Sequence, residues 1–451
     1  MFGFSSDTGE STRAPGTHWS RRSLLRTSAG LGTSALLADG TLTGCSGRPS
    51  GATQVRVWSW LTGMDQYVAA FNSAQRDVHV ELSVIAAGIS GGYAQQTNAI
   101  RAHNAPDILH VEYQALPQIV TTGGLRDLSA EVDDLAGGFL PAAWQGVRPG
   151  GKTWALPMDF CPMAFFYRKD LFDKAGIEVP RTWQEFRHAA SAVRRADRGA
   201  RITTFPLNDG AFFAGMAWQA GDPWWDIAAD SWRVAIDGTG TLRVAEYWQD
   251  MVSSGRAAHS ATGTQSWISA MHHGRLWGML GATWGVGMLK KSLPADKGRW
   301  AVAPLPAWDG DPSTGVWGGS AFGISAESKV PEAALTFLRW LSTDPAVPKI
   351  GSKVTFPSPA YRASRQVARG AYRDDFFAGQ PVFDVLDQAA TRVPEWTWGP
   401  TSLSAFATIA DTLGPVSTRA TTIPRAIHQV QSSTVAAMRA RGLAVTGGSR
   451  T

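Results

Sequence analysis

The sequence predicts a layered α/β fold, because strand-like alternation of apolar and polar residues repeatedly gives way to helical periodicity. Residues 54–60 and 78–85 alternate apolar and polar side chains, which indicates half-buried strands. A helix is predicted between them over 66–72, and another over 93–103 precedes a short strand over 108–111. This order predicts parallel βαβ units, whose ligands bind at the carboxyl ends of the strands.

Two further helices carry distinct local signals. Thr182 and Glu185 have the spacing of a capping box at the start of a helix predicted over 183–195. Residues 331–341 place apolar side chains at helical spacing, so one face of this helix is expected to pack on a core. The segment 305–319 is rich in Pro and Gly, which predicts a loop or a crossing between domains.

Length and composition exclude several classes of protein. A chain of 451 residues suggests two or three domains, and 44% hydrophobic with 18% charged residues is a globular balance. No apolar run reaches the roughly 18 residues that a membrane span needs. The net charge of +5 comes without a basic stripe, so we predict no nucleic-acid partner. Two cysteines exclude a disulfide framework and a cysteine-rich zinc site.

The amino terminus has the features of an export signal. The pair Arg21–Arg22 precedes a weakly apolar stretch and resembles a twin-arginine signal, and residues 42–45 (LTGC) resemble a bacterial lipobox. Asp39 is an unusual charge for this position, so the twin-arginine and general secretory routes both stay open. The alternative is a disordered tail with an incidental cysteine. We predict an export signal over 1–44, a lipid on Cys45, and a linker over 45–53.

Catalytic and metal-binding motifs give no convincing match. Residues 146–153 satisfy the phosphate-loop pattern, but no β-branched strand precedes them and Pro157 opposes a following helix. A Pro-Gly-Gly turn between two short strands is the preferred interpretation. His272 and His273 are adjacent, so their rings point apart on a helix and cannot share a metal ion. We therefore predict no catalytic residue, no metal site and no cofactor.

One long segment resembles a known family. Residues 151–186 contain a Gly-Lys turn, a Leu-Pro pair, a strand ending in Tyr-x-Lys-Asp, and then Gly-Ile, Pro and Thr-Trp-x-Glu. Similar pieces occur in the same order elsewhere, at 55–60, 105–107, 123–128, 317–325 and 332–345. This ordered set resembles the family 1 extracellular solute-binding proteins of ABC importers, which are maltose-binding-protein-like. The matching residues of the long segment are Gly151, Lys152, Leu156, Pro157, Tyr167, Lys169, Asp170, Leu171, Phe172, Gly176, Ile177, Pro180, Thr182, Trp183 and Glu185.

The resemblance implies an α/β, two-lobe periplasmic-binding-protein-like fold of type II. Each lobe is then discontinuous, and a hinge of several segments joins the two. The expected crossings lie near 156–160, 316–320 and 356–359. The implied lobes are 54–157 plus 320–356 at the N-terminal side and 158–319 plus 357–451 at the C-terminal side. Closure around a ligand would be a hinge motion.

The resemblance also implies a function: a non-enzymatic, monomeric receptor that is lipid-anchored outside the cytoplasmic membrane and passes a mono- or oligosaccharide to the permease subunits. Aromatic rings stack on the apolar faces of sugars, and carboxylates and amides bind the hydroxyls. Carried over by position, the implied ligand-binding residues are Trp58, Ser59, Trp60, Glu112, Tyr113, Asp159, Asn208, Asp209, Phe212, Trp284, Trp317, Gly318, Gly319, Glu395, Trp396 and Trp398.

Other interpretations stay open. A tryptophan belongs to a core more often than to a ligand platform, and we assign Trp183 and Trp340 to structure. A receptor for another solute, such as a polyol phosphate or an anion, would bring arginines or helix N-termini to the cleft, and the 20 tryptophans argue against it. A secreted glycoside hydrolase needs two carboxylates about 5–9.5 Å apart, and no hydrolase motif accompanies Glu112 or Asp159.

Overall fold

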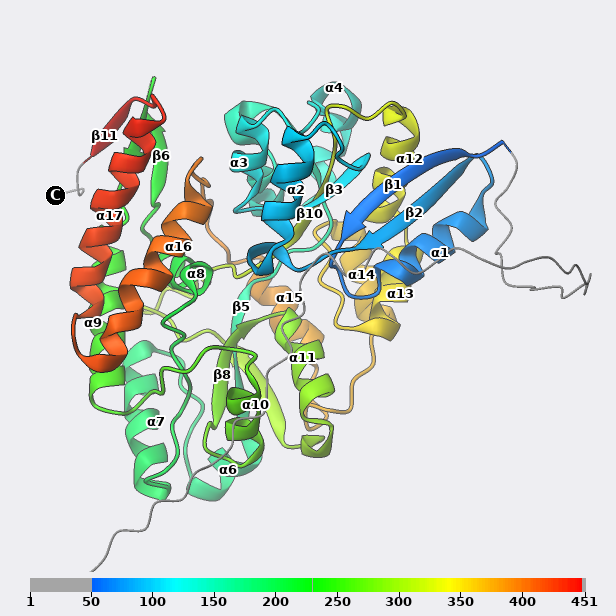
Figure 1. The fold of residues 1–451 in the computed structure, drawn as a ribbon. Helices are drawn as coiled ribbons and strands as arrows, with labels where there is room; N and C mark the ends of the chain where they lie inside the picture. The colour runs from blue at the N-terminus through cyan, green and yellow to red at the C-terminus, as the bar shows by residue number, and fades with distance from the viewer. Residues whose placement is uncertain (1–50, 229, 448–451) are drawn as a thin grey trace, which may run out of the picture. The chain divides into compact units, whose positions relative to one another are not determined.

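A five-stranded sheet in the order β2-β1-β3-β10-β4 organises the first part of the computed structural model, which describes residues 51–228 and 230–447 (Figure 1). β1 runs parallel to β2 and β3, whereas β10 is antiparallel to β3 and β4. The predicted parallel βαβ units are therefore confirmed for the first three strands. The export signal and Cys45 lie outside the described residues. The strands are β1 (Thr53–Ser59), β2 (Val78–Val84), β3 (Ile108–Glu112), β4 (Leu156–Pro157) and β10 (Ser320–Ile324).

Helices from both ends of the chain cover this sheet. α1 (Met64–Ala74) packs on β2, and α12 (Pro331–Thr343) packs on β1, β4 and β10 with Phe337, Leu338 and Leu341 buried, as the helical spacing predicts. α2 (Gly92–Arg101) ends before the predicted boundary because His103 has a left-handed φ of 53°. The other helices of this region are α3 (Leu116–Thr121), α4 (Ser129–Val132), α5 (Pro141–Gly146) and α13 (Ala346–Val354). α14 (Arg362–Ala371) packs on α13 but contributes Ala368 to the core of the second sheet described below.

A second sheet, in the order β8-β5-β9, is antiparallel and buried along nearly its whole length. α7 begins with the predicted capping box, in which Thr182 accepts from the N–H of Glu185 at 3.1 Å and the Glu185 carboxylate accepts from the N–H of Thr182 at 3.3 Å. The elements here are β5 (Met163–Arg168), β8 (Gly278–Ala282), β9 (Trp300–Pro304), α6 (Lys169–Ala175), α7 (Trp183–Ala196), α10 (Gln265–His272), α11 (Trp284–Ser292) and α15 (Val382–Ala390).

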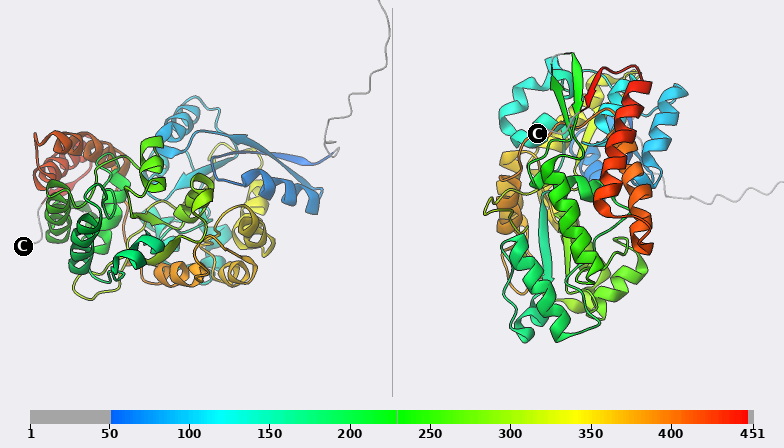
Figure 2. Two further views of the ribbon diagram at one scale, coloured as in Figure 1. Left: turned by 90° about the horizontal axis from the view of Figure 1, so that it is seen from below. Right: turned by 90° about the vertical axis from the view of Figure 1, so that its left-hand side faces the viewer.

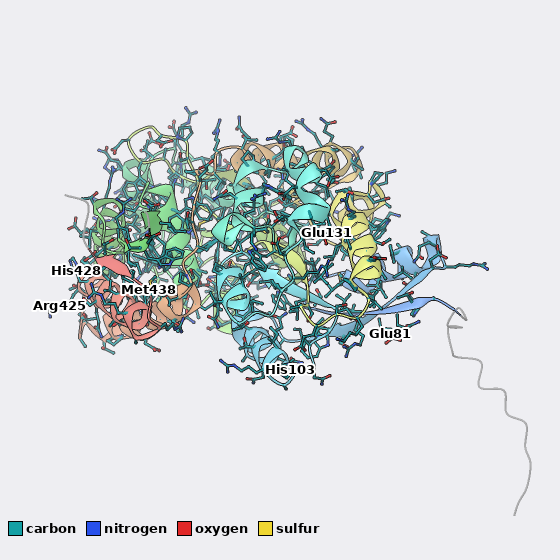
Figure 3. The ribbon with its side chains drawn as sticks, turned by 90° about the horizontal axis from the view of Figure 1, so that it is seen from above. Glu81, His103, Glu131, Arg425, His428 and Met438 are labelled. Atoms are coloured by element: carbon teal, nitrogen blue, oxygen red, sulfur yellow. The ribbon has the colours of Figure 1, made fainter. Side chains whose placement is uncertain are left out.

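A helical layer flanks a third, small sheet in the order β11-β7-β6. α17 lies beside α16 and α9, as the side view shows (Figure 2). The exposed face of α17 carries His428, which lies 2.9 Å from an Asp237 oxygen (Figure 3). The elements are β6 (Trp225–Ala228), β7 (Ser231–Val234), β11 (Val445–Gly447), α8 (Gly210–Gln219), α9 (Thr239–Ser253), α16 (Ser402–Leu413) and α17 (Ile423–Ala440).

Three chain segments pass between the five-stranded sheet and the β5 sheet, and they lie side by side. The N–H of Phe160 donates to the carbonyl of Ser358 at 2.9 Å, and the N–H of Met158 donates to the carbonyl of Ser320 at 2.8 Å. The N–H of Trp317 donates to the carbonyl of Cys161 at 3.1 Å. These segments, residues 156–160, 316–320 and 356–359, are called the hinge segments below.

The phosphate-loop pattern adopts a different structure from that of a nucleotide site. A 3-10 turn over Pro149–Gly151 is followed by β4, so the turn itself is as expected. The expectation of a short strand before it is wrong, because α5 precedes the turn and Pro141 occupies the first helical turn, where its missing N–H costs nothing. Lys152 lies 3.1 Å from Asp127, a surface ion pair.

The described residues hold no group of three or more His, Cys, Asp or Glu side chains arranged to bind a metal ion. None of the helices in this part of the chain combines the length and the apolar composition of a membrane span.

Candidate ligand-binding site

Two tryptophans from different elements form the aromatic centre of the site. Trp284 is the first residue of α11, directly after β8, and Trp317 lies in the second hinge segment. The indole N–H of Trp284 donates to the carbonyl oxygen of Trp317 at 2.9 Å, and the two rings meet edge to face at 4.7 Å. Phe212 of α8 supports Trp317 from behind at 5.1 Å. Trp284 remains partly exposed, so it is the ring of this group best placed to meet a ligand.

Glu112, at the end of β3, faces the same place from the five-stranded sheet. Its carboxylate accepts hydrogen bonds from the Tyr93 hydroxyl and from the Gln114 amide, the latter at 3.1 Å. A Cβ added to Gly318 would lie 3.6 Å from the indole nitrogen of Trp284 and 4.0 Å from Oε1 of Glu112. The two side chains therefore converge on Gly318, whose φ of 89° favours glycine.

Burial raises the pKa of the Glu112 carboxyl to about 7. The bond from Tyr93 opposes this rise, and the nearby charges of Asp159 and Asp209 add to it. Glu112 is thus close to half-protonated at neutral pH. The protonation of Glu112, and so the charge that a hydroxyl-rich ligand meets there, therefore depends on the groups around this carboxyl.

Asp159, in the first hinge segment, is fixed by the chain around it. Its Oδ1 accepts from the N–H of Ser320 at 2.5 Å, and its carbonyl accepts from the Tyr113 hydroxyl at 2.8 Å. Burial raises the pKa of Asp159 to about 6, and the bonds from Ser320 oppose this rise. Ser320 follows Gly319, whose position against the Tyr113 ring leaves no room for a Cβ.

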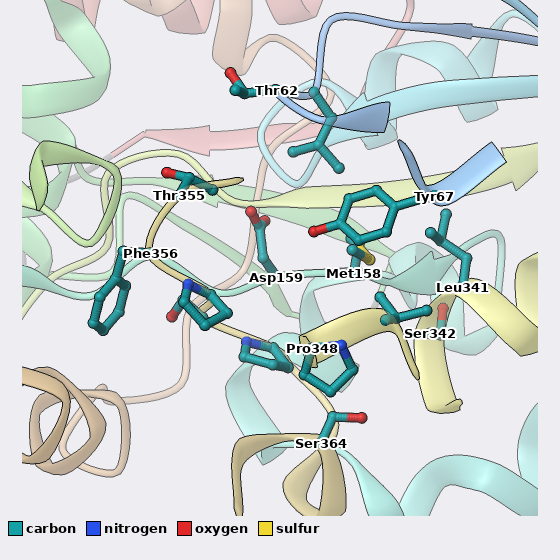
Figure 4. Close-up of a pocket in the computed structure, with 15 residues that line it drawn as sticks. Thr62, Tyr67, Met158, Asp159, Leu341, Ser342, Pro348, Thr355, Phe356 and Ser364 are labelled. Carbon is teal, nitrogen blue, oxygen red and sulfur yellow. The ribbon is translucent and has the colours of Figure 1, made fainter. Parts of the chain in front are cut away.

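Asp159 also lines a small cavity between the first and third hinge segments and the helices α1, α12 and α13 (Figure 4). Tyr67, Thr62 and Thr355 lie around it, and Pro348 and Ser364 close the far side. Its volume is about 50 Å³. This is space for one or a few water molecules, whereas ligand pockets usually measure about 300–1,000 Å³. The cavity belongs to the hinge and does not hold a sugar ring.

Asp209 completes a group of three carboxyls that approach from three elements. It caps α8 by accepting from the N–H of Phe212 at 2.9 Å, and burial raises its pKa. The charges of Asp159 and Asp209 both raise the pKa of the Glu112 carboxyl, so the three carboxyls lie near one another. Within residues 51–228 and 230–447, no Lys, Arg or His side chain forms a salt bridge with any of them.

The end of β1 supplies one further aromatic ring. Trp60 is partly exposed and stacks on His110 with 3.9 Å between ring centroids. Ser59 is buried, with 1% of its surface exposed, and its hydroxyl lies 3.1 Å from Nδ1 of His110. Trp58 is partly exposed and, by strand alternation, points to the opposite face of β1 from Ser59.

The two predicted C-terminal tryptophans pack around Trp218. Trp396 stacks on Trp218 at 4.7 Å, and Trp398 meets Trp218 edge to face at 5.6 Å. Only 5% of the Trp396 surface and 8% of the Trp398 surface are exposed. Among the described residues, neither ring contacts Trp284 or Trp317 directly. Asn208 and Glu395 are exposed.

Sequence reasoning missed two side chains that shape the site, namely Tyr93 and His110. Both have the pattern of core residues, of a helix and of a strand, because periodicity reports burial and not hydrogen bonding. The strand-end rule does place residues 112–114, which include Gln114, near a possible site.

Comparison with known proteins places the chain among binding proteins. Residues 58–348 match the model of the family described as bacterial extracellular solute-binding protein. The arabinooligosaccharide-binding protein of Bacillus subtilis (strain 168) is 24% identical over 367 residues, which cover 76% of this chain and 84% of that protein. The lactose-binding protein of Rhizobium radiobacter is 25% identical over 305 residues, which cover 65% of this chain and 70% of that protein.

Solved structures agree in fold. A binding protein of an ABC transporter from B. animalis subsp. lactis Bl-04, in complex with β-1,6-galactobiose, has a TM-score of 0.78 at 27% identity and covers 88% of this chain and 100% of its own. The galacto-N-biose/lacto-N-biose I-binding protein of Bifidobacterium longum, in complex with lacto-N-biose, has a TM-score of 0.78 at 25% identity with the same coverage. These similarities confirm the predicted α/β, two-lobe periplasmic-binding-protein-like fold with discontinuous lobes and a multi-segment hinge.

Proposed function

The chain belongs to the bacterial extracellular solute-binding protein family, and we propose that it is the saccharide receptor of an ABC importer. The observation that carries the proposal is the convergence of Trp284 and Glu112 at Gly318 in a hinge segment. Glu112 ends β3 of the five-stranded sheet, and Trp284 begins α11 just after β8 of the second sheet. The Trp284 ring can then stack on the apolar face of a sugar, and the neighbouring carboxylates can accept hydrogen bonds from the sugar hydroxyls.

The proposed ligand-binding residues fall into two groups. One group is supported by contacts, which for Trp60 run through Tyr93 to Glu112. It consists of Trp60, Glu112, Tyr113, Asp159, Asp209, Phe212, Trp284, Trp317, Gly318 and Gly319. The group that stands on sequence position alone consists of Trp58, Ser59, Asn208, Glu395, Trp396 and Trp398. Three residues of the first group are buried and would support the more exposed side chains without touching the ligand, namely Tyr113, Phe212 and Gly319.

The charge around the site supports a saccharide over an anion. Three carboxyls lie near Trp284, and none of the basic side chains of the described residues pairs with them. A phosphate or a carboxylate ligand would need arginines or unoccupied helix N-termini there. The N-terminus of α8 already holds Asp209, whereas that of α11, at Trp284, has no side-chain cap. The carboxyls without a basic partner therefore make a polyol phosphate the weaker candidate.

We propose that the protein binds its ligand without transforming it. The relatives named above are binding proteins, and Glu112 and Asp159 accept hydrogen bonds from neighbours that hold them in place. A glycoside hydrolase is the remaining enzymatic alternative. Incubation with oligosaccharides followed by chromatography separates the two, because a receptor releases no shorter sugar.

The proposed cycle uses the hinge segments. We place the lobes at 54–157 plus 320–356 and at 158–319 plus 357–451, so that Trp60 and Glu112 belong to one lobe and Trp284 to the other. Closure brings these groups around the ligand, and the closed monomer then delivers it to the permease subunits. A lipid on Cys45 holds the receptor at the outer face of the cytoplasmic membrane.

A thermal-shift screen tests the proposal, because a ligand that binds only the folded state raises its stability, by about 2.7 kcal/mol at a concentration one hundred times Kd. The panel contains monosaccharides, lactose, β-1,6-galactobiose, lacto-N-biose, arabino-oligosaccharides, sugar phosphates and inorganic phosphate. We expect an uncharged saccharide to raise the melting temperature. A shift given only by the phosphorylated compounds would replace the proposal with the alternative receptor.

A further inference from the structure

Three rings form a continuous stack that ends at Trp60. Phe322 of β10 stacks on His110 of β3 at 4.7 Å with an interplanar angle of 19°, and His110 stacks on Trp60 at 3.9 Å with an angle of 22°. Phe322 is 1% exposed and His110 is fully buried, whereas Trp60 is partly exposed. The stack, called the Trp60 stack below, therefore runs from the interior of the five-stranded sheet to the end of β1.

Hydrogen bonds hold the middle ring in one orientation. The Ser59 hydroxyl lies 3.1 Å from Nδ1 of His110, and the backbone N–H of Trp60 donates to the same nitrogen at 3.4 Å. Ser59 in turn accepts from the N–H of Leu61 at 3.0 Å, so its own hydrogen is directed to His110. Nδ1 is thus an acceptor, and the proton of the neutral ring lies on Nε2.

The His110 ring stays neutral at the pH values at which proteins are ordinarily studied. Burial lowers the pKa of His110 to about 3. A neutral, flat ring packs against an indole without the cost of burying a charge. Nothing in this arrangement makes His110 itself accessible to a ligand.

We propose that His110 is a positioning residue, which holds the Trp60 indole as a preformed platform for a sugar ring. The inference rests on the proposed function. It adds that the Trp60 ring is already held in its binding orientation before a ligand arrives, because His110 packs against it. Tyr93 extends the arrangement, because its ring meets Trp60 edge to face at 5.9 Å and its hydroxyl donates to Glu112. The platform and the carboxylate are therefore fixed by one connected set of side chains.

Two substitutions separate the ring from the hydrogen bond. His110→Phe keeps a flat ring in the stack and loses the acceptor. His110→Asn keeps an acceptor on the same Cγ atom, in the place of Nδ1, and loses the ring. With β-1,6-galactobiose as the probe, we expect His110→Asn to weaken binding about three- to tenfold, the range of one aromatic pair, and His110→Phe to change it by less than about twofold.

Two controls test whether the effect of His110→Asn on affinity runs through Trp60. Phe337→Leu removes a buried ring of α12 that packs on Phe71, away from the Trp60 stack, so it should lower the melting temperature without changing affinity. In a Trp60→Ala background, His110→Asn should have no further effect on affinity, because the residue acts through Trp60. Equal weakening by Phe337→Leu, or additive effects of His110→Asn and Trp60→Ala, would overturn the proposal.

A measurement without ligand decides the matter independently. In protein labelled with 5-fluorotryptophan, the ¹⁹F signal of Trp60 is assigned by its loss in Trp60→Phe. The signal should keep its shift and width in His110→Phe and should move or broaden in His110→Asn. An unchanged signal in His110→Asn would refute the positioning role even if sugars bind. If the wild type binds no saccharide but the signal behaves as expected, the proposed function fails and the inference about Trp60 order stands.

Discussion

Oδ1 of Asp159 accepts a hydrogen bond from the backbone N–H of Ser320 at 2.5 Å, and this bond joins the first hinge segment to the second. The backbone of Asp159 also pairs with Pro359 in the third hinge segment. Its carbonyl accepts from the Tyr113 hydroxyl, just after β3. Asp159 thus connects all three hinge segments. It belongs both to the hinge and to the group of three carboxyls at the site.

Substitution of Asp159 should separate the hydrogen bond from the charge. Asp159→Ala removes the acceptor for Ser320, and we expect the free energy of unfolding to fall by about 1–3 kcal/mol, as for a buried donor left unsatisfied. Asp159→Asn keeps an acceptor and removes a charge that burial disfavours, so its stability at pH 7.5 should be equal to or above that of the wild type. Urea denaturation of both variants measures this. An equal loss in both would show that the charge, and not the bond, stabilises the hinge.

Replacement of Trp284 should weaken saccharide binding and leave the fold intact. Trp284→Ala removes a partly exposed ring at the site, and we expect a loss of about 2 kcal/mol in binding free energy, typical of an aromatic anchor. Isothermal titration with the best saccharide of the panel gives the number. Trp340→Phe is the matched control, since Trp340 packs on Phe71 in the α12 layer. Undiminished affinity in Trp284→Ala would remove this residue from the site.

The stability of the ligand-free protein should fall as the pH rises toward neutrality. The folded-state pKa of Glu112, about 7, lies above its ordinary value of 4.5. The native state therefore binds more protons than the unfolded state between these values, and the contribution is full below about pH 4.5 and lost through pH 7. The Glu112 contribution is on the order of 1–3 kcal/mol. Urea denaturation at pH 5 and pH 8 should show a smaller difference in Glu112→Gln than in the wild type.

Saccharide affinity should change with pH in the opposite direction. Sugar hydroxyls donate more strongly to a carboxylate than to a carboxylic acid, so binding favours the ionised form of Glu112. Titrations at pH 5.5 and pH 8 should give tighter binding at pH 8, and Glu112→Gln should flatten this dependence. A wild-type affinity that is constant across the range would mean that Glu112 does not accept from the ligand.

The lipid anchor is tested with the two cysteines of the chain. Cys45→Ser should move the protein from the membrane fraction to the soluble exported fraction, because no acylation site remains. Cys161→Ser is the control, since Cys161 is buried and should not affect anchoring. Membrane association of Cys45→Ser would contradict the lipoprotein prediction.

The first three strands of the five-stranded sheet were predictable because they and the helices around them keep clean periods, whereas the antiparallel β10 was not predicted as a strand. β1 alternates buried and more exposed residues, and α12 presents Phe337, Leu338 and Leu341 on one face. α8 gave no such signal, since nearly all of its residues are buried and its apolar side chains follow no single face. The capping box of α7 was visible because both partners are local in sequence.

The site was predictable only as far as strand ends define it. That rule selected Glu112, and the family resemblance supplied Trp284, which the fold brings together with Glu112 at Gly318. It cannot tell which way a side chain points, so it also selected Ser59, whose hydroxyl is used internally by His110. The separate cluster of Trp396 with Trp218 depends on contacts between residues far apart in the chain, which no local pattern reports.

The position of β10 has a consequence for how the protein folds. This strand lies between β3 and β4 in the sheet, yet it is synthesised some 160 residues after β4. Until residues 320–324 leave the ribosome, the inner edge of β3 has no hydrogen-bonding neighbour on that side. Closing such a long loop is slow compared with local helix formation. A nascent chain therefore carries this strand edge unpaired from the synthesis of residue 112 until that of residue 324.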